Sequence, residues 1–527
     1  MPSLQENNRN TKPAEKKPLL KISNLKQYFP LKTKGLFVKA NDGVTLDIYE
    51  GETLGLVGES GCGKSTLGRT ILQLYRQTDG RTMYYGRSLD DIAPKYVEET
   101  IHTLDKRKIK LKELEQKRDA MQKEYDAMPD GPAKFDKQNE LQHARKAAND
   151  EFLDTANILG GFMTVSDTKP VIEVFSEMYR HSRQLCELEE KLADANLDLE
   201  DAKFALRKAK EAGKSTDSLQ SKQEKAQEKA DKIQNEIDGV HNDLAQVRAR
   251  IDEMRKQYVS DPEFQRVETY RDDGIDLARL TYNEIRLLRS DLQMIFQDPY
   301  SSLNPRMTVG QIISEGMMAH KMFKKADERL QERIIKVMDD AGLQAYFIHR
   351  YPHQFSGGQR QRIGIARSLA VQPKFVVCDE AVSALDVSIQ SQIINLLQDL
   401  KEQQNLTYLF ITHDLSVVKY ISDRIGVMYL GNIVELAESQ EIFDHPLHPY
   451  TEALMNAIPT TDIEANKELQ ILEGDIPSPV KPPEGCKFHT RCRYCTEVCQ
   501  HVVPEWVEAA PNHFVACHHI LGSHAEE

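Results

Sequence analysis

The sequence lacks any run of about 18 apolar residues, so nothing in it predicts a helix that spans a membrane. It also lacks an excess of basic residues, because 69 Lys and Arg stand against 82 Asp and Glu, a net charge of -13. This balance argues against a basic surface for nucleic acid over the whole protein, although a local basic patch stays possible. Residues 1–18 have no apolar stretch of the kind found in secretory signals, so we expect a disordered N-terminal arm and a cytoplasmic location.

Glycine and proline are scarce between about 95 and 265, where Lys, Glu, Gln, Asp and Ala dominate. The length of 527 residues is typical of about three domains. The segments on either side have the composition of a globular domain. The chain therefore divides into a domain of 19–86 plus 273–440, an insert of 87–272 and a tail of 441–527 rich in Pro, His and Cys. In the cytoplasm we expect the eight cysteines to be thiols or metal ligands rather than disulfides.

The insert carries apolar residues at alternating spacings of three and four, the pattern of a coiled coil. A short Gly/Ser/Asp turn near 211–218 separates two such runs, so we expect an antiparallel hairpin roughly 40 Å long. A weaker helical pair flanks 129–134. The alternative is a charged disordered linker, which the unbroken heptads disfavour. The heptad positions are Leu185, Leu188, Leu192, Ala195, Leu199, Ala202 and Leu206, then Ala226, Ala230, Ile233, Ile237, Val240, Leu244, Val247, Ile251 and Met254.

A glycine-rich segment between a predicted strand, 53–57, and a predicted helix, 66–74, carries the first chemistry. It matches the phosphate-binding pattern G-x-x-x-x-G-K-[ST], in which backbone N–H groups and a helix N-terminus hold phosphate oxygens. Lys64 is predicted to reach the β- and γ-phosphates, and Ser65 to ligate Mg²⁺. The nucleotide-binding residues predicted here are Gly58, Glu59, Ser60, Gly61, Cys62, Gly63, Lys64, Ser65 and Thr66.

Two carboxylates, Asp379 and Glu380, end the apolar run 375–378. A buried strand would deliver both to its carboxyl end, beside the phosphate loop. Asp379 fits a direct or indirect ligand of Mg²⁺, and Glu380 fits a base that polarises the attacking water. Many strands end in acidic residues, so this pair alone is a weak signal. Together with the glycine-rich loop upstream it becomes a specific one.

Three further motifs follow in a fixed order. Gln297 comes after a predicted strand at 292–296, and His413 comes after another at 408–412. Between them, Ser356, Gly357, Gly358 and Gln359 open a helical stretch and predict a second anion-binding helix N-terminus. Each motif alone is weak, since a Gln is usually solvated, a His usually structural and a glycine pair usually a turn.

Together these motifs resemble the ATP-binding-cassette ATPases over roughly 19–86 and 274–440. The segments ESGCGKST, QMIFQDPYSSLNPRMTVG, YPHQFSGGQRQR, DEAVSALDVSIQ and ITHDLSVV are similar to ATPase subunits of oligopeptide and dipeptide importers, as are EIFDHPLHPYTEAL and the Cys-rich tail. The resemblance implies an α/β P-loop cassette with a small Cys-rich tail, and the heptads of 87–272 add an inserted antiparallel coiled-coil arm to this fold. The family gives no account of the insert, so its direction and partner stay open.

The resemblance also implies roles for individual residues. Gln297 would sense Mg²⁺ and couple to membrane subunits, and His413 would contact the γ-phosphate. Tyr28 or Phe29, with Phe29 preferred, would stack on adenine. Two ATPase domains would pack head to tail around two ATPs, so that the signature at 356–359 completes the opposite subunit's site and 383–386 crosses the dimer.

The resulting hypothesis is an ATP-hydrolysing motor of a peptide importer on the cytoplasmic face of the cell membrane. Its expected partners are two membrane permease subunits, a second related ATPase subunit and, through the complex, an extracellular peptide-binding protein. Nucleic acid is not an expected partner. The alternative is a chromosome-maintenance ATPase, whose coiled coil is inserted after the residue equivalent to Gln297, whereas this insert precedes it. A translation-type ATPase would need two phosphate loops. Peptide preference and the activity of the partner's ATP site stay undetermined.

The tail places four cysteines within 486–499, and Cys517 follows. Four thiolates are the usual ligands of both Zn²⁺ and [4Fe–4S], so spacing alone does not choose between them. Unligated thiols are the alternative. The tail's similarity to the GC-x-F-x-x-RC…C…C pattern of the importer subgroup implies an iron–sulfur cluster held by Cys486, Cys492, Cys499 and Cys517, with Cys495 as an extra cysteine.

Overall fold

The computed structural model describes residues 17–129, 132–383, 385–456 and 474–522. Most of the predicted N-terminal arm therefore lies outside the described residues, and the first strand begins at its last residue, Pro18. None of the helices in these ranges is both long and apolar enough to cross a bilayer.

The central feature is an eight-stranded sheet in the order β11-β12-β10-β9-β3-β8-β7-β6. Strands β9, β3, β8, β7 and β6 run parallel, and β10, β12 and β11 continue the sheet antiparallel. All residues of β3, β7 and β8 are buried, as expected for strands covered on both faces. The bounds are β3 Thr53–Val57, β6 Leu292–Ile295, β7 Phe375–Asp379, β8 Thr407–Ile411, β9 Arg424–Tyr429, β10 Asn432–Glu438, β11 Val507–Ala510 and β12 His513–Val515.

A second, antiparallel sheet has the order β2-β1-β4-β5. Its strands are β1 Pro18–Pro30, β2 Phe37–Tyr49, β4 Asp79–Tyr84 and β5 Ile275–Asp276. The two sheets share one hydrophobic core, into which α1 (Lys64–Ile71) contributes Leu67 and Ile71. Helices α12 (Val387–Gln404) and α13 (Leu415–Ile421) bury apolar residues in a second cluster with β7 and β8. This layered arrangement of helices and sheets is the predicted α/β class.

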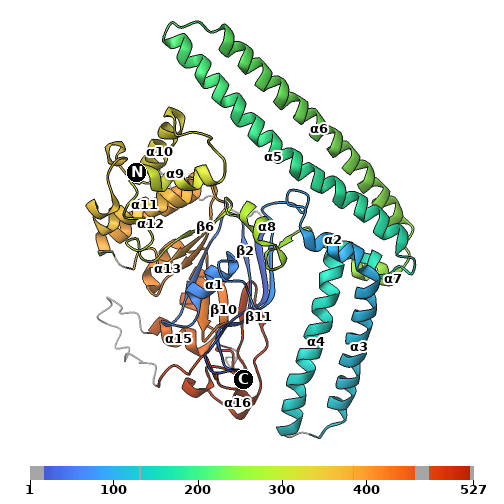
Figure 1. Ribbon diagram of the computed structural model, residues 1–527. Coiled ribbons are helices and arrows are strands. Elements are labelled where there is room, and N and C mark those ends of the chain that lie inside the picture. The colour runs from blue at the N-terminus through green and yellow to red at the C-terminus, as the bar shows by residue number, and fades with distance from the viewer. Residues whose placement is uncertain (1–16, 130–131, 384, 457–473, 523–527) are drawn as a thin grey trace, which may run out of the picture.

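Three helices build a separate helical unit, labelled at the upper left of Figure 1. They are α9 (Val309–Ala319), α10 (Glu328–Asp340) and α11 (Gly357–Leu369). Their apolar residues form a hydrophobic cluster of their own, distinct from the cluster under the sheets. Helix α8 (Tyr282–Leu287) lies between β5 and β6 in the chain.

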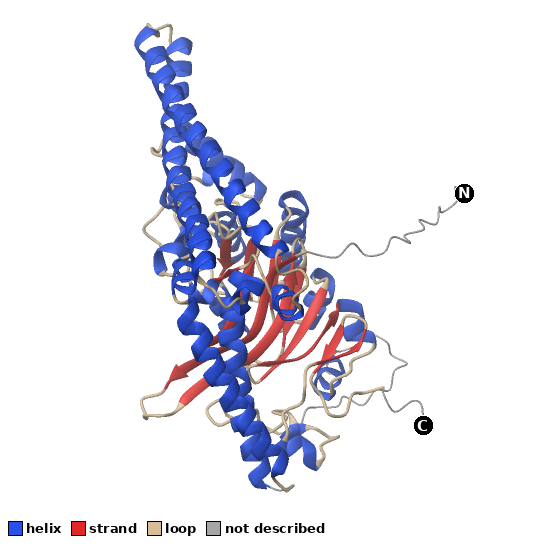
Figure 2. Cartoon of the chain, turned by 90° about the vertical axis from the view of Figure 1, so that its right-hand side faces the viewer, coloured by secondary structure: helices blue, strands red, loops and turns tan. Residues whose placement is uncertain are grey.

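The chain between β4 and β5 is helical and extends from the cassette in two directions (Figure 1). One hairpin pairs α3 (Leu104–Ala127) with α4 (Pro132–Leu159), and the other pairs α5 (Lys169–Glu211) with α6 (Asp217–Lys256). Figure 2 shows both hairpins edge-on beside the sheets. The short helices α2 (Lys95–His102) and α7 (Pro262–Glu268) lie at the joint. Both ends of the segment meet where Tyr84 pairs with Ile275.

The α5–α6 hairpin buries eleven of the sixteen apolar positions that the heptad pattern selects, and the other five are partly buried. Leu185, Leu188, Ile237, Val240 and Leu244 form one hydrophobic cluster along it. Helix α5 begins at Lys169, well before the first heptad residue, and its 43 residues span about 65 Å at 1.5 Å per residue. The hairpin is therefore longer than the predicted 40 Å, because the first turns of α5 pack on the cassette core without following the heptad.

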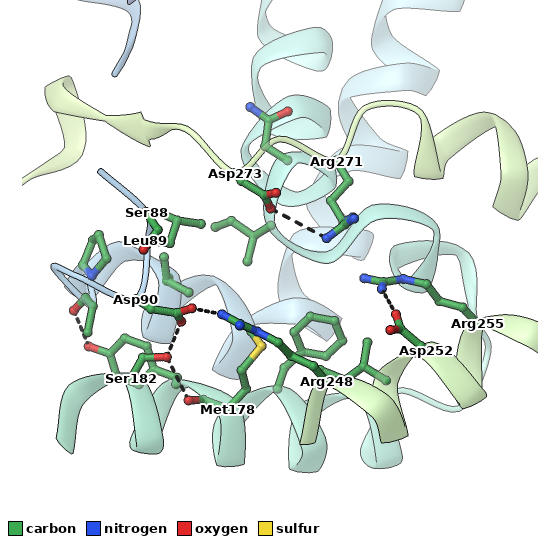
Figure 3. Close-up of a pocket in the computed structure, with 18 residues that line it drawn as sticks. Ser88, Leu89, Asp90, Met178, Ser182, Arg248, Asp252, Arg255, Arg271 and Asp273 are labelled. Carbon is green, nitrogen blue, oxygen red and sulfur yellow. Dashed lines mark hydrogen bonds and ion pairs between the residues drawn. The ribbon is translucent and has the colours of Figure 1, made fainter. Parts of the chain in front are cut away.

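A cavity of about 430 Å³ lies where α5 and α6 meet the segment after β4 (Figure 3). Arg248 of α6 forms an ion pair with Asp90, and Ser182 of α5 donates a hydrogen bond to the same carboxylate. Arg255 and Arg271, which also line this cavity, pair with carboxylates as well. Because its cations are already neutralised, we interpret this cavity as a polar joint that fixes the hairpin to the cassette.

Farther along, the acidic side of α5 contacts the basic loop between α9 and α10. Lys321 Nζ lies 3.0 Å from Glu190, and Lys324 Nζ lies 2.5 Å from Asp198. Arg329 pairs with Asp201, and its guanidinium lies 4.9 Å from the centre of the Phe204 ring. Helix α5 thus connects the core of the cassette to the helical unit.

The tail returns to the cassette instead of forming a separate body. Strand β12 pairs with β10, and helices α14 (Ser439–Asp444), α15 (Pro449–Asn456) and α16 (Glu497–His501) follow β10. Glu435 of β10 is fully buried and accepts hydrogen bonds from the backbone N–H groups of Leu447 and His448, and its Oε1 lies 2.7 Å from Nε2 of His513. These polar contacts hold the tail against the edge of the main sheet.

Candidate active site

The glycine-rich loop turns from β3 into α1 as predicted. Gly63 adopts φ +107°, and a Cβ there would lie 2.2 Å from the carbonyl oxygen of Ala40, so only glycine fits. The side chain of Lys64 folds back into the loop, where its Nζ donates to the carbonyl oxygens of Gly58 (2.8 Å) and Glu59 (3.0 Å). The ammonium is therefore held at the centre of the loop, in the position from which it could meet a phosphate.

A cavity of about 800 Å³ opens over this loop and collects residues 60–66 of the loop together with Phe29, Gln297, Glu380 and His413, whereas Gly58 and Glu59 do not line it. Its floor is the loop itself, one end is formed by β1 and β2, and the other end by residues that follow β6, β7 and β8. Parallel strands deliver their carboxyl ends to one edge of a sheet, which is why segments far apart in the chain meet here. The lining residues are Phe29, Val38, Lys39, Ala40, Ser60, Gly61, Cys62, Gly63, Lys64, Ser65, Thr66, Gln297, Glu380, His413, Leu430, Gly431 and Pro479.

Glu380 is in contact with both other predicted catalytic residues. The side-chain amide of Gln297 donates to Glu380 Oε2 at 2.6 Å, and Nδ1 of His413 lies 3.5 Å from Glu380 Oε1. Glu380 also has a left-handed backbone, φ +47°, and its N–H donates to the carbonyl of Ile411. This turn directs the carboxylate into the cavity immediately after β7 ends.

Asp379 is completely buried beneath the cavity. Its Oδ2 lies 3.3 Å from Arg69 Nη2, whereas its Oδ1 has no hydrogen-bond partner among the described residues. A buried carboxylate oxygen without a partner is costly, and a cation bound nearby would compensate it. The hydroxyl of Ser65 and the carboxylate of Asp379 are oxygen donors that Mg²⁺ prefers, so these residues fit the predicted metal.

Phe29, the residue predicted to stack on adenine, lies at the wall of the cavity. It stacks edge-on against Tyr75, with ring centroids 5.3 Å apart. Tyr28 points elsewhere, because its hydroxyl donates to Asp42. The geometry therefore favours Phe29 over Tyr28.

The signature residues 356–359 do not line this cavity. Ser356 caps α11 by accepting from the N–H of Gln359 at 3.4 Å, and Gln359 accepts from the N–H of Ser356 at 3.2 Å. Ser356 and Gly357 are exposed, so the helix N-terminus is open to another molecule. The predicted dimer-crossing loop 383–386 contains position 384, which lies outside the described residues.

The cysteines of the tail lie near one another. Burial raises the pKa of Cys517 to about 12; the hydrogen bond from the N–H of His519 opposes this rise, and the neighbouring Cys486, Cys492 and Cys499 add to it. The N–H of Cys486 donates to the carbonyl of Cys499 at 2.8 Å. Within the described ranges, however, no group of three or more His, Cys, Asp or Glu side chains is arranged to hold a metal ion. The donor set fits a thiolate-bound metal, but the side chains do not converge on one point.

Two tail residues that contact the cavity or the phosphate loop were not predicted from the sequence. Pro479 lines the cavity, and Arg491 contacts Glu59 of the phosphate loop. The tail pattern drew attention only to its cysteines. The arginine directly before Cys492 was part of that pattern and was the one available signal.

Comparison with known proteins agrees with these motifs. A family model described as "ABC transporter" matches residues 41–170 and 264–383, and one described as "Oligopeptide/dipeptide transporter, C-terminal region" matches 434–499. The oligopeptide transport ATP-binding protein AppF of Bacillus subtilis is 52% identical over 250 residues, which are 46% of this chain and 75% of AppF. The chain belongs to the ABC transporter ATPase family. The predicted cassette fold and ATPase class are thereby confirmed.

Other relatives carry related names. The oligopeptide transport ATP-binding protein OppF of Salmonella typhimurium is 53% identical over 247 residues, covering 46% of this chain and 73% of OppF. A solved dimeric bacterial ABC transporter cassette aligns at 16% identity with a TM-score of 0.41, covering 80% of this chain and 98% of that one. The family model leaves 171–263 unmatched, a range that contains α6 and nearly all of α5.

Proposed function

We propose that this chain is the ATP-hydrolysing motor subunit of a peptide importer. The observation that carries the proposal is the convergence of the phosphate loop with Gln297, Glu380 and His413 in one cavity. The match of the tail to the oligopeptide/dipeptide transporter C-terminal region supports the substrate class. The relatives named for oligopeptide transport support it as well.

In this proposal Glu380 is the base that polarises the attacking water, and the amide of Gln297 and the imidazole of His413 orient its carboxylate. Lys64 leaves its carbonyl partners to neutralise the β- and γ-phosphates, and Phe29 stacks on adenine. Ser65, Asp379 and Gln297 would hold Mg²⁺, which when bound neutralises phosphate charge. The remaining loop residues supply N–H groups to the phosphates.

Hydrolysis then requires a second ATPase subunit. The exposed N-terminus of α11, with Ser356, Gly357, Gly358 and Gln359, would complete the opposite subunit's ATP site. We further propose that two permease subunits and an extracellular peptide-binding protein form the rest of the complex, and that this chain lies peripherally at the cytoplasmic membrane face.

The domain organisation proposed for the chain follows the sequence divisions. Residues 19–86 plus 273–440 form the cassette, 87–272 an inserted coiled-coil arm and 441–527 the tail, whereas the predicted arm of 1–18 lies, apart from its last two residues, outside the described residues. Cys486, Cys492, Cys499 and Cys517 would hold an iron–sulfur cluster, with zinc as the alternative, and Cys495 would not be a ligand. The similarity of the tail to the importer pattern that contains these four cysteines supports this ligand set.

The proposal is tested by purifying the tagged chain from native membranes and identifying what comes with it. Two permeases and a second ATPase are expected, and peptide uptake should be lost in Lys64→Ala while the complex still assembles. Recovery of chromosome-associated proteins instead of permeases would favour the chromosome-maintenance alternative.

A further inference from the structure

We propose that the C-terminal tail is part of the nucleotide site, with Arg491 as a positioning residue for the phosphate loop. The inference rests on the proposed ATP site and extends it to residues more than 400 positions away from that loop in the chain. Its basis is a set of contacts between the short segment 486–492 and the cassette.

The central contact joins Arg491 to Glu59, the second residue of the phosphate loop. The guanidinium donates from Nη1 to Oε2 at 2.7 Å and from Nη2 to Oε1 at 3.0 Å, a two-pronged ion pair. The side chain of Arg491 is only 4% exposed and that of Glu59 is 23% exposed. Paired, charge-assisted hydrogen bonds of this kind fix both position and orientation.

Glu59 is held at two more points. Its N–H donates to the hydroxyl of Tyr450 at 3.0 Å, and its carbonyl oxygen accepts from Lys64 Nζ at 3.0 Å. The carbonyl that receives the Lys64 ammonium therefore belongs to a residue whose side chain Arg491 holds. Loss of Arg491 would free the loop at the place where the phosphate-binding lysine rests.

Neighbouring residues of the same segment anchor it in the cassette. Phe488 is 2% exposed and packs edge-on against Tyr429, with ring centroids 5.2 Å apart. Lys487 Nζ donates to Asp42 at 3.0 Å and to the carbonyl of Leu430, which lines the nucleotide cavity. The segment is therefore a rigid support for the loop.

A second tail residue reaches the opposite end of the cavity. Pro479 lines it together with Phe29 and Val38, and its carbonyl accepts from the N–H of Lys39 at 3.1 Å. The tail thus contacts the site both at the predicted adenine end and behind the phosphate loop. If the tail only stabilised itself, neither the contact of Pro479 with the cavity nor that of Arg491 with Glu59 would be required.

The test measures MgATP affinity of the full-length chain by titration calorimetry. Arg491→Met should weaken MgATP binding by about tenfold or more, the order expected for losing a charge-assisted pair, and Arg491→Lys should restore part of it. Arg493→Met is the matched control. Arg493 lies on the other side of Cys492 and pairs with Glu452 of α15 instead of with the phosphate loop, so its loss should leave affinity unchanged.

Melting temperature and metal content are measured for every variant, because a purely structural role would change these and not the affinity of the folded protein. If Arg491→Met does not fold, the MgATP affinity of Glu59→Gln is measured instead. This variant weakens the same ion pair by changing its more exposed partner. Unchanged MgATP affinity in the folded variant would overturn the inference. Failure of the unmodified chain to bind MgATP would instead overturn the proposed function.

Discussion

The amide of Gln297 donates a 2.6 Å hydrogen bond to the carboxylate of Glu380, although helices α9, α10 and α11 and strand β7 separate the two residues in the chain. His413 approaches the other oxygen of the same carboxylate at 3.5 Å. One carboxylate is thus oriented from both sides by groups that follow neighbouring parallel strands. This arrangement makes Glu380 the residue whose chemistry is most directly testable.

Glu380→Gln should bind MgATP and fail to hydrolyse it. The amide keeps the shape of the side chain but does not accept a proton from water, so turnover should fall by about 10²-fold or more. Steady-state ATPase activity is measured in the assembled transporter, with the partner's ATP site disabled in parallel. Near-normal turnover would contradict the assignment of Glu380 as the base.

Ser356→Arg should abolish hydrolysis and leave MgATP binding to the isolated chain intact. Ser356 lies outside the chain's own nucleotide cavity, at an exposed helix N-terminus, so a bulky cation there would block only the closed dimer. Binding is measured on the single chain and hydrolysis on the complex. Loss of binding by the single chain would contradict the head-to-tail arrangement.

Cys492→Ser should lose the bound metal, whereas Cys495→Ser should keep it. Cys492 is one of the four proposed ligands, whereas Cys495 is the extra cysteine outside the proposed ligand set. Anaerobically purified protein should be brown and contain about four irons per chain, as a [4Fe–4S] cluster requires. Colourless protein with one zinc would replace the cluster by a zinc site, and protein free of metal would contradict both.

The stability of the tail should fall in mild acid because of His448. Burial lowers the pKa of this side chain to about 4, and its Nδ1 accepts from the N–H of Tyr450 at 3.0 Å. The unfolded chain takes up the proton near pH 6.5, so the contribution is complete above that pH and is lost as pH falls toward 4. The difference between the pKa of His448 in the folded and in the unfolded chain corresponds to a contribution of up to about 3 kcal/mol to the free energy of unfolding.

Urea unfolding between pH 4 and 8 measures this effect. His448→Asn keeps an acceptor without a titrating ring and should flatten the acid limb of the stability curve. His445→Asn is the control, since that ring is 71% exposed and should leave the curve unchanged. An identical acid limb in the native protein and His448→Asn would contradict the prediction.

Elements that a local pattern specifies could be predicted from the sequence, whereas elements that depend on long-range packing could not. Strand β3 has the predicted bounds, because a short apolar run before a glycine-rich loop is specified locally. The start of α5 was missed, because Val171, Val174 and Phe175 pack into the cassette core and do not follow the heptad. Strands β11 and β12 were also missed, since both are short and only the pairing of β12 with the distant β10 joins their hairpin to the sheet.

Removal of the distal α5–α6 hairpin should leave a folded, ATP-binding cassette. The contacts Glu177–Arg250 and Asp198–Lys229 define the pairing of the helices, so 189–238 can be replaced by a short Gly-rich turn. Removal of 90–270 should instead lower the melting temperature, because Tyr96 and Val97 of α2 are buried in the cassette core.

Thermal unfolding and MgATP titration compare the two deletions. The shorter one also removes the acidic partners of Lys321, Lys324 and Arg329, so it should loosen the helical unit and leave the nucleotide cavity intact. An unfolded product from the shorter deletion would show that the hairpin supports the cassette along its whole length.

The adjacency of β4 and β5 has a consequence for how such proteins diversify. Because Met83 and Tyr84 pair directly with Asp276 and Ile275, the cassette closes its sheet whatever lies between them. Chain-closure entropy grows slowly, by only about 0.6 kcal/mol for each doubling of loop length. The β4–β5 connection is therefore an insertion site at which evolution or engineering can exchange whole modules. Each new module must cover the part of the cassette core that α2 now covers.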